Sequence, residues 1–306
     1  MAGALATSVR AVDHQAPESS VWAPFLEDPQ RAAIVTDFDG TLAPIVDDPS
    51  ESRPLPGAVD VLHRLSHRYA RVGVVSGRPA AFIAEHLRAD AGESDESGQR
   101  EESGQCEESG DCNGVVVSGL YGLEKAQVSR TQIPGTQNPG AQGGEVTPHP
   151  DAEGWRQVVD EVVAAAEENA PDGVVVEDKG LSVTIHYRGA QEHEGWVKEW
   201  AEERARATGL SAHPARMSYE LRLPIESDKG SALTELVSGL SIACFAGDDS
   251  GDLPAFEALD RLARDEGMMV LKVAVRSGES PPELLERADV EVDGPEGMVK
   301  LFAGLL

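Results

Sequence analysis

The sequence has few basic residues, few cysteines and no long apolar run, and each shortage excludes a class of protein. Its 306 residues include 26 Lys and Arg against 54 Asp and Glu, which gives a net charge of −28. Nucleic acids and anionic membranes repel so acidic a chain, so we expect neither as a partner. A phosphorylated substrate stays compatible with this charge, because a metal ion and a few local cations decide whether it binds.

The low number of cysteines and the lack of a long apolar run bear on the cellular compartment in which the protein is expected. The three cysteines, Cys106, Cys112 and Cys244, are too few for a disulfide framework in a chain of this length. A transmembrane helix needs a run of about 18 apolar residues, and none is present. Residues 1–15 lack the basic-then-apolar order of a secretory signal. We therefore expect a cytoplasmic protein, with enough hydrophobic residues for one large domain or two modest ones.

The most informative stretch is Ile34-Val35-Thr36-Asp37-Phe38-Asp39-Gly40-Thr41-Leu42. Branched residues followed by glycine predict a short buried strand that ends in a tight loop. On a strand, Asp37 and Asp39 would point the same way. Two carboxylates so close are unfavourable unless a cation lies between them or one is protonated. Mg²⁺ prefers such oxygen ligands, so a metal site is favoured here over two solvated acids in a turn.

A second cluster of acids follows another predicted strand, residues 241–246. Here Gly247-Asp248-Asp249-Ser250-Gly251-Asp252 contains three acids within five residues. This density suits metal binding better than a surface turn. We expect Asp248 to bind Mg²⁺ directly, with Asp249 and Asp252 acting through water or by orienting a lysine.

Two further sites suit phosphate. Residues 71–75 predict a buried strand, and Ser76-Gly77 at its end offers a hydroxyl and a closely approachable backbone N–H. Lys229 lies at a predicted helix start, where the helix dipole mildly disfavours a cation. That position makes sense if Lys229 faces a phosphate dianion.

Three segments are expected to lie outside the packed domains. Residues 1–30 read as a polar leader, with an anchor within Val21–Leu26. Residues 93–113 repeat acidic Glu-Ser-Gly units, which cannot bury enough apolar surface to become ordered. Residues 131–150 form a second low-complexity stretch and are expected to be a flexible insert. We assign no catalytic role to these segments.

Asp37–Leu42 resembles the first motif of the haloacid-dehalogenase-like (HAD) phosphatases, and Ser76, Lys229-Gly230 and Asp248–Asp252 resemble the later motifs. The resemblance implies an α/β fold with a Rossmann-like parallel-sheet core. It also implies that Asp37 is the nucleophile that forms an aspartyl phosphate and that Asp39 is the general acid/base. In this family Asp39 binds metal through its backbone carbonyl. The expected metal ligands are Asp37, Asp39 and Asp248, and the expected phosphate contacts are Thr41, Ser76, Gly77 and Lys229, with Lys229 also catalytic.

Between the second and third motifs the pattern changes. Leu181, Val183, Ile185 and Tyr187 alternate with polar residues, which predicts a strand with one wet face. Helices and further strands surround it, as in an α+β module. This resembles the cap that the superfamily inserts at this point. We expect residues 118–223 to form the inserted cap domain, and residues 31–117 and 224–306 to form the catalytic core.

The motifs of the cap narrow the resemblance to the trehalose-6-phosphate phosphatases, over about residues 31–306. They are Gly122-Leu123-Glu124, Val176-Glu177-Asp178-Lys179, His186-Tyr187-Arg188 and Glu220-Leu221-Arg222. Carboxylates and a lysine can bind sugar hydroxyls, so Glu124, Glu177, Lys179 and Glu220 are the expected sugar-binding residues. The alternative for Glu177 and Lys179 is an exposed ion pair. The chain departs from the family at Tyr121, where histidine is frequent, and at Gly251 and Leu253, which flank Asp252.

The resemblance implies Mg²⁺-dependent hydrolysis of trehalose 6-phosphate, the last step of trehalose biosynthesis, and a functional link to a trehalose-6-phosphate synthase. Two alternatives stay open. One is a phosphatase for another sugar phosphate, of the sucrose or mannosylglycerate type. The other is a non-catalytic regulatory module that binds a sugar phosphate. Pseudo-enzymes usually lose the nucleophile or the lysine, whereas Asp37, Asp39, Lys229 and Asp248 are all present.

Overall fold

The computed structural model describes residues 21–46, 48–88, 114–129, 145–152, 154–215, 217–278 and 280–306. Residues 1–20 of the leader, the acidic repeat at 93–113 and most of the insert at 131–150 lie outside these ranges. The chain divides into two compact units, Met1–Val72 with Leu233–Leu306, and Gly73–Ala232. Each unit is described by itself. The predicted boundaries of the catalytic core and the cap stay a prediction.

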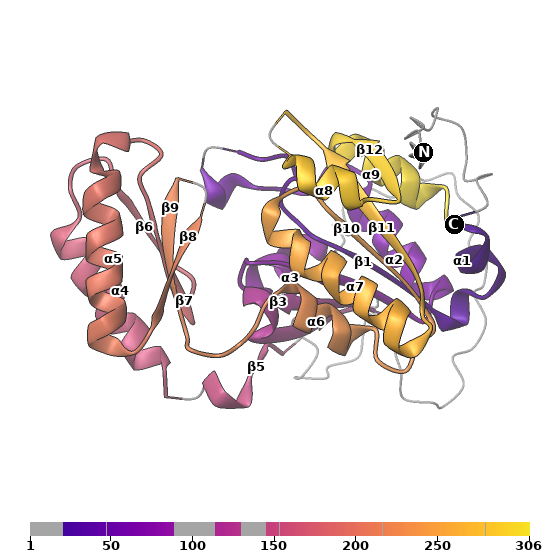
Figure 1. The fold of residues 1–306 in the computed structure, drawn as a ribbon, viewed down its shortest axis with the longest axis horizontal. Coiled ribbons are helices and arrows are strands. Elements are labelled where there is room, and N and C mark those ends of the chain that lie inside the picture. Colours follow the sequence, from indigo (N-terminus) through magenta and orange to yellow (C-terminus); the bar gives the residue numbers. More distant parts are fainter. Residues whose placement is uncertain are drawn as a thin grey trace, which may run out of the picture. The chain divides into compact units, whose positions relative to one another are not determined.

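The first unit is built on parallel strands (Figure 1). Their order is β12 (Val290–Asp293), β11 (Met269–Arg276), β10 (Ile242–Gly247) and β1 (Ala32–Thr36), followed by the first residues of β2 (Arg71–Val75). Pairing of β1 with β10, β10 with β11 and β11 with β12 is parallel. Every residue of β1 and β10 is buried. Continuous apolar strands of this kind are typical of a sheet that is covered on both faces.

Helices cover these strands. They are α1 (Ala23–Glu27), α2 (Ala58–Arg68), α7 (Leu253–Glu266), α8 (Pro282–Arg287), α9 (Gly294–Ala303) and the end of α6 (Lys229–Leu236), with short 3₁₀ turns η1 (Pro29–Arg31), η2 (Pro49–Glu51) and η6 (Ser250–Asp252). Helix α7 packs on β10 and β11, and α9 packs on α2, β11 and β12. Trp22 and Phe25 are buried against each other, with ring centroids 5.2 Å apart. These aromatic residues hold the described part of the leader.

The second unit contains two groups of strands. After the end of β2 come β3 (Val115–Gly119), β4 (Glu124–Val128) and β5 (Thr147–Pro148), and β3–β4 and β4–β5 pair antiparallel. A separate antiparallel sheet has the order β6 (Val175–Asp178), β7 (Ser182–His186), β9 (Ser218–Arg222) and β8 (Ser211–Ala215). The helices of this unit are α3 (Ala80–Leu87), α4 (Arg156–Asn169) and α5 (Glu194–Thr208), and the short turns are η3 (Leu120–Gly122), η4 (Pro150–Ala152) and η5 (Gln191–His193).

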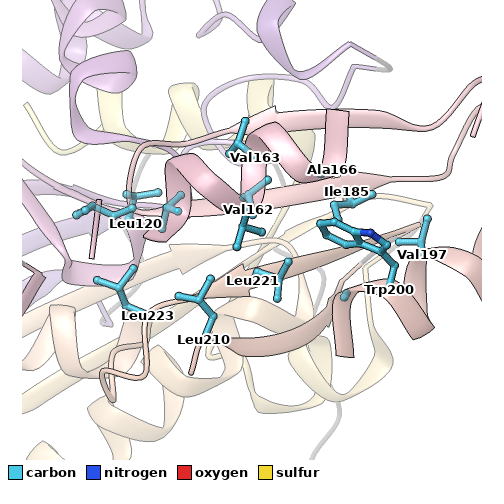
Figure 2. Packing of buried hydrophobic residues seen from close by; sticks show 14 of the residues in the cluster. Leu120, Val162, Val163, Ala166, Ile185, Val197, Trp200, Leu210, Leu221 and Leu223 are labelled. Atoms are coloured by element: carbon cyan, nitrogen blue, oxygen red, sulfur yellow. The ribbon is translucent and has the colours of Figure 1, made fainter. Parts of the chain in front are cut away.

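Helices α4 and α5 pack on the four-stranded sheet (Figure 1), α4 on β6 and β7 and α5 on β8 and β9. Figure 2 shows the core between them, where Val162 of α4, Trp200 of α5 and Leu221 of β9 point into one cluster. Ile185 of β7 joins the same cluster. Burial of side chains of this size stabilises a fold by about 1.5–3 kcal/mol each, as an upper estimate.

The opposite face of this sheet corrects one expectation. The polar residues of the predicted strand were expected to be wet, yet Ser182 and Thr184 are only 2% and 3% exposed. The reason is that this face is occupied by charged residues. Ser182 Oγ donates a hydrogen bond of 2.9 Å to Glu220 of the neighbouring strand. Glu220 thus satisfies the buried hydroxyl of Ser182, whereas the buried Oγ1 of Thr184 has no hydrogen-bond partner among the described residues.

The architecture confirms the predicted α/β class with a large parallel sheet. Among the helices that the structure describes, none has the length and apolar character needed to cross a membrane.

Candidate active site

Asp37 directly follows β1, and the backbone there fixes its direction. Its N–H donates to the carbonyl of Ala246 at 2.8 Å, which extends the pairing of β1 with β10 by one residue. The chain then turns sharply, since Gly40 N–H bonds to Ala43 at 2.7 Å. Gly40 has a φ of +76°, and a Cβ there would overlap the carboxylate of Asp248. Only glycine suits this position, which explains Asp-Gly in the sequence.

Three carboxylates converge at this end of the first unit. Oxygens of Asp37, Asp248 and Asp252 lie within 4.8 Å of one another, and all three residues are buried. Their exposures are 4%, 3% and 0%. Three buried anions so close repel one another strongly unless a cation compensates them. An all-oxygen set of carboxylates suits a hard divalent ion such as Mg²⁺, so the residues present fit the metal that the sequence predicts.

Hydrogen bonds fix the side chains of Asp248 and Asp252. Thr41 Oγ1 donates to Asp248 Oδ1 at 3.4 Å. Asp252 Oδ2 accepts the N–H groups of Asp248 at 2.9 Å and of Asp249 at 3.1 Å, which closes a capping box at η6. Asp249 itself accepts Gly251 N–H at 2.8 Å through Oδ1. Asp252 therefore shapes the loop and also belongs to the carboxylate cluster. Its expected action through water or by orienting a lysine stays a prediction.

Asp39 is half-buried, and among the described residues the three-carboxylate cluster does not include its side chain. Its Oδ1 accepts a hydrogen bond of 2.7 Å from Ser52 Oγ. This arrangement is compatible with the expectation that Asp39 meets the metal through its backbone carbonyl and keeps its carboxyl group for proton transfer.

Two predicted phosphate-binding residues of the second unit, Ser76 and Lys229, are buried, whereas Gly77 is half-buried. Ser76 is 2% exposed and follows β2, where its N–H donates to Ser118 at 3.0 Å. Ser76 Oγ accepts the N–H of Arg78 at 3.2 Å. Lys229 is 5% exposed at the start of α6. The helix start is capped by Asp228, whose Oδ1 accepts Ser231 N–H at 2.7 Å. That these residues meet the carboxylates of the first unit stays a prediction.

Gly77 lies in close contact with Tyr121, the residue at which the chain departs from the motif expected from the resemblance. A Cβ on Gly77 would lie 2.5 Å from the hydroxyl oxygen of Tyr121. Tyr121 has a φ of +60°, a conformation that non-glycine residues seldom adopt. Its N–H donates to Ser76 at 3.0 Å, and its carbonyl accepts the hydroxyl of Ser227. Tyr121 is thus held by hydrogen bonds with Ser76 of the predicted phosphate loop and with Ser227, which lies just before α6.

The predicted sugar-binding residues of the four-stranded sheet come together. Lys179 Nζ lies 3.3 Å from Glu220 Oε1 and 3.9 Å from Glu177 Oε2. The side chain of Lys179 is 12% exposed and that of Glu220 only 3%. Glu177 pairs with Thr184, and Thr184 pairs with Glu220, so these residues form one row across three strands. The alternative for Glu177 and Lys179 was an exposed ion pair, but their side chains are only 23% and 12% exposed.

Three residues that the sequence did not single out complete this cluster. Arg78 lies 3.6 Å from Glu177 Oε1, and His186 Nε2 lies 2.8 Å from Glu177 Oε2. Arg222 lies 2.6 Å from Glu220 Oε2. The sequence did contain a hint of them: Arg78 directly follows Ser76-Gly77, and His186 and Arg222 belong to two of the cap motifs. Strand parity places Arg222 and Glu220 on one face, whereas Arg78 comes from outside the sheet.

The surroundings set the charge of these acids. Burial alone raises the pKa of Glu177, but the hydrogen bond with His186 and the charges of Lys179 and Arg78 outweigh it, so the pKa lies below its usual value. Burial likewise raises the pKa of Glu220, and Lys179 and Arg222 reverse the effect and lower it. Both carboxylates are therefore ionised at neutral pH, as needed to accept hydrogen bonds from a polyol.

Glu124 occupies a different environment. Its Oε2 accepts the N–H of Ala80 at 2.8 Å, at the start of α3. Burial raises the pKa of Glu124, although this hydrogen bond and the charge of Arg156 act in the opposite direction. An anion at a helix start is stabilised by the helix dipole. The structure thus gives Glu124 a backbone contact in addition to its predicted role at the sugar.

The chain matches known proteins in sequence. The trehalose-phosphatase family model matches residues 35–91 and 97–290. A trehalose-phosphate phosphatase from Mycolicibacterium paratuberculosis is 29% identical over 240 residues, which cover 75% of this chain and 52% of that protein. The chain therefore spans about half the length of the curated relatives it matches.

Solved structures share the fold. A trehalose-6-phosphate phosphatase related protein has a TM-score of 0.64 at 23% identity, covering 89% of this chain and 95% of its own. A haloacid dehalogenase-like hydrolase from Bacteroides thetaiotaomicron has a TM-score of 0.55 at 16% identity, covering 90% of this chain and all of its own. These likenesses confirm the predicted HAD-like fold. Because the family model matches most of its length, the chain belongs to the trehalose-phosphatase family.

Proposed function

We propose that this protein is a Mg²⁺-dependent phosphatase that hydrolyses trehalose 6-phosphate to trehalose and phosphate, the last step of trehalose biosynthesis. The observation that carries the proposal is the buried cluster of Asp37, Asp248 and Asp252, whose carboxylate oxygens lie within 4.8 Å of one another. Such a cluster needs a cation, and a strand end is the usual ligand-binding edge of an open α/β sheet.

The metal would be held by Asp37, Asp248 and the backbone carbonyl of Asp39, with Asp252 beside them. When bound, Mg²⁺ supplies positive charge that offsets the negative charge of the substrate's phosphate. Thr41, Ser76, Gly77 and Lys229 would bind the other phosphoryl oxygens. Asp249 would support the metal loop through water.

The first chemical step is attack of an Asp37 carboxylate oxygen on phosphorus. The bond from phosphorus to the sugar oxygen breaks, and Asp39 gives its proton to that oxygen as the sugar leaves. Asp37 then carries the phosphoryl group as an aspartyl phosphate. In the second step Asp39 removes a proton from water while the water oxygen attacks phosphorus. The bond to Asp37 breaks and inorganic phosphate leaves.

The sugar would bind to the charged cluster of Glu177, Lys179 and Glu220 on the four-stranded sheet. Glu177 and Glu220 are ionised acceptors for sugar hydroxyls, and Lys179 between them is a donor. Glu124 is the fourth proposed contact. Binding energy far from the phosphate can be used to orient the ester bond for reaction. We further propose a link in metabolism to a trehalose-6-phosphate synthase, a cytoplasmic location, and no nucleic-acid or membrane partner.

A phosphate-release screen tests the proposal. Purified protein is given trehalose 6-phosphate, sucrose 6-phosphate, mannosylglycerate phosphate and glucose 6-phosphate, each with Mg²⁺ and with EDTA. We expect the highest kcat/KM for trehalose 6-phosphate and no release in EDTA. A higher kcat/KM for another sugar phosphate would replace the substrate but keep the reaction. Saturable binding of a sugar phosphate without release would instead indicate a regulatory module.

A further inference from the structure

A hydroxyl outside the predicted motifs contacts the proposed general acid. Ser52 Oγ donates a hydrogen bond of 2.7 Å to Asp39 Oδ1. Ser52 is fully buried, whereas Asp39 is half-buried. A buried hydroxyl that donates to a carboxylate beside a cluster of acids differs from a solvated loop residue, because a hydrogen bond to a charged group is stronger in a buried environment than in water.

Hydrogen bonds to backbone carbonyl groups fix the loop that carries Ser52. Arg53 Nη1 donates to the carbonyl oxygens of Ser50 and Ser52, both at 2.8 Å. Leu55 N–H donates to the carbonyl of Leu42 at 2.9 Å, which joins the loop to the turn after Asp39. The position of the Ser52 hydroxyl is therefore set by the surrounding chain.

We propose that Ser52 is a positioning residue that holds the Asp39 carboxyl group in the orientation from which it exchanges a proton with the substrate oxygen and with water. This role rests on the proposed function. The terminal torsion of aspartate has broad preferences, and a general acid must lie within about 2.6–3.2 Å of the atom it protonates. A hydroxyl donates to a carboxylate and accepts from a carboxylic acid, so the contact serves both protonation states of Asp39.

The chemistry of the leaving group gives a specific test. A sugar oxygen must receive a proton as it leaves, whereas p-nitrophenolate leaves as a stable anion. The ratio kcat/KM reports steps up to release of the leaving group, so it isolates the step in which Asp39 acts as acid. In Ser52→Ala we expect kcat/KM for trehalose 6-phosphate to fall about tenfold, the effect of one hydrogen bond to a charged group. For p-nitrophenyl phosphate we expect a change below about twofold.

The chain offers a matched control. Ser50 Oγ donates an equally long hydrogen bond of 2.7 Å to Asp48 Oδ1, but this contact is exposed and lies in the 3₁₀ turn η2, which ends just before Ser52. Ser50→Ala should leave kcat/KM for both substrates unchanged. Ser52→Thr keeps a hydroxyl and should preserve the wild-type ratio of the two kcat/KM values. The free energy of unfolding of each variant, from urea denaturation, reports structural damage separately.

Two results would overturn the role of Ser52. One is an equal loss on both substrates in Ser52→Ala, which indicates a structural role. The other is no loss on either substrate. A wild-type protein that releases no phosphate would overturn the proposed function and this role with it, whereas an active wild type with equal losses overturns the role of Ser52 alone.

Discussion

The guanidinium carbon of Arg222 lies 3.8 Å from the centre of the Tyr121 ring. The same guanidinium pairs with Glu220, and the Tyr121 hydroxyl lies against Gly77. Tyr121 therefore connects the predicted phosphate loop with the charged cluster of the four-stranded sheet, inside one compact unit. Cation–π contacts of this kind contribute about 0.5–2 kcal/mol.

Gly77→Ala tests the packing of this tyrosine. The new Cβ would lie 2.5 Å from the Tyr121 hydroxyl oxygen and 2.7 Å from its ring. We expect the free energy of unfolding, measured in urea, to fall by about 1–3 kcal/mol. Gly195→Ala in α5 is the control, because its Cβ would meet nothing within 4 Å, and it should be at least as stable as wild type. Equal stability of Gly77→Ala and wild type would contradict the described contact.

The sugar-binding proposal predicts a loss of selectivity. In Lys179→Ala, the ammonium group between Glu177 and Glu220 is removed. We expect kcat/KM for trehalose 6-phosphate to fall about tenfold or more, as for a hydrogen bond to a charged group, while activity on p-nitrophenyl phosphate is largely kept. Lys198→Ala, an exposed lysine of α5, should change neither. Parallel losses on both substrates would point to structural damage, and no loss would point to an ion pair without a role in binding.

The pKa shifts predict two opposite effects of pH on stability. The pKa of Glu220 is lowered in the folded protein, so its contribution is present above the unfolded pKa of about 4.3 and is lost as the pH falls through the folded pKa. Glu220→Gln should therefore flatten the acid decline, by up to about 1.4 kcal/mol per pH unit.

Glu124 should act in the other direction. Its pKa is raised by burial, so its stabilising contribution is present below the unfolded pKa and is lost as the pH rises through the folded pKa. Glu124→Gln should make stability rise more steeply with pH just above about pH 4.3. Urea titrations between pH 3 and 7 measure both slopes. Slopes that change in the same direction for Glu220→Gln and Glu124→Gln would contradict the environments described.

The carboxylate cluster predicts that Mg²⁺ stabilises the fold. At a Mg²⁺ concentration a hundred times Kd, the gain for wild type should be about 2.7 kcal/mol. Asp248→Asn removes one of three converging anions, so its gain from Mg²⁺ should be much smaller, while in EDTA it should be at least as stable as wild type. Asp151→Asn, an exposed acid of the other unit, should respond to Mg²⁺ like wild type. An unchanged Mg²⁺ response in Asp248→Asn would exclude Asp248 as a ligand.

Much of the fold was predictable because its central strands carry strong patterns. The strand before Asp37, the strand at residues 71–75 and the strand before Asp248 were predicted from apolar runs, and β1, β2 and β10 occupy these positions. The edge strand β8 was not predicted. Ser211–Ala215 contains a proline and no apolar alternation, and an edge strand buries too little for a clear pattern.

The site was predictable where its residues follow strands with a strong apolar pattern, and less so where its contacts come from loops or from outside a strand pattern. Asp37 and Asp248 could be paired because both follow buried parallel strands. The contact of Arg78 with Glu177 joins residues that are far apart in the chain, and the bond from Ser52 to Asp39 comes from a loop without periodicity. Neither a strand pattern nor local spacing encodes such contacts.

Phosphate release by Asp37→Asn tests the central claim most directly. The amide of asparagine is too poor a nucleophile to form a phosphoenzyme. Purified wild type and variant are compared with trehalose 6-phosphate and saturating Mg²⁺, after a cooperative urea unfolding transition has shown that each is folded. We expect rapid release by wild type and release at background level by Asp37→Asn. Turnover by Asp37→Asn at the wild-type rate would contradict this claim.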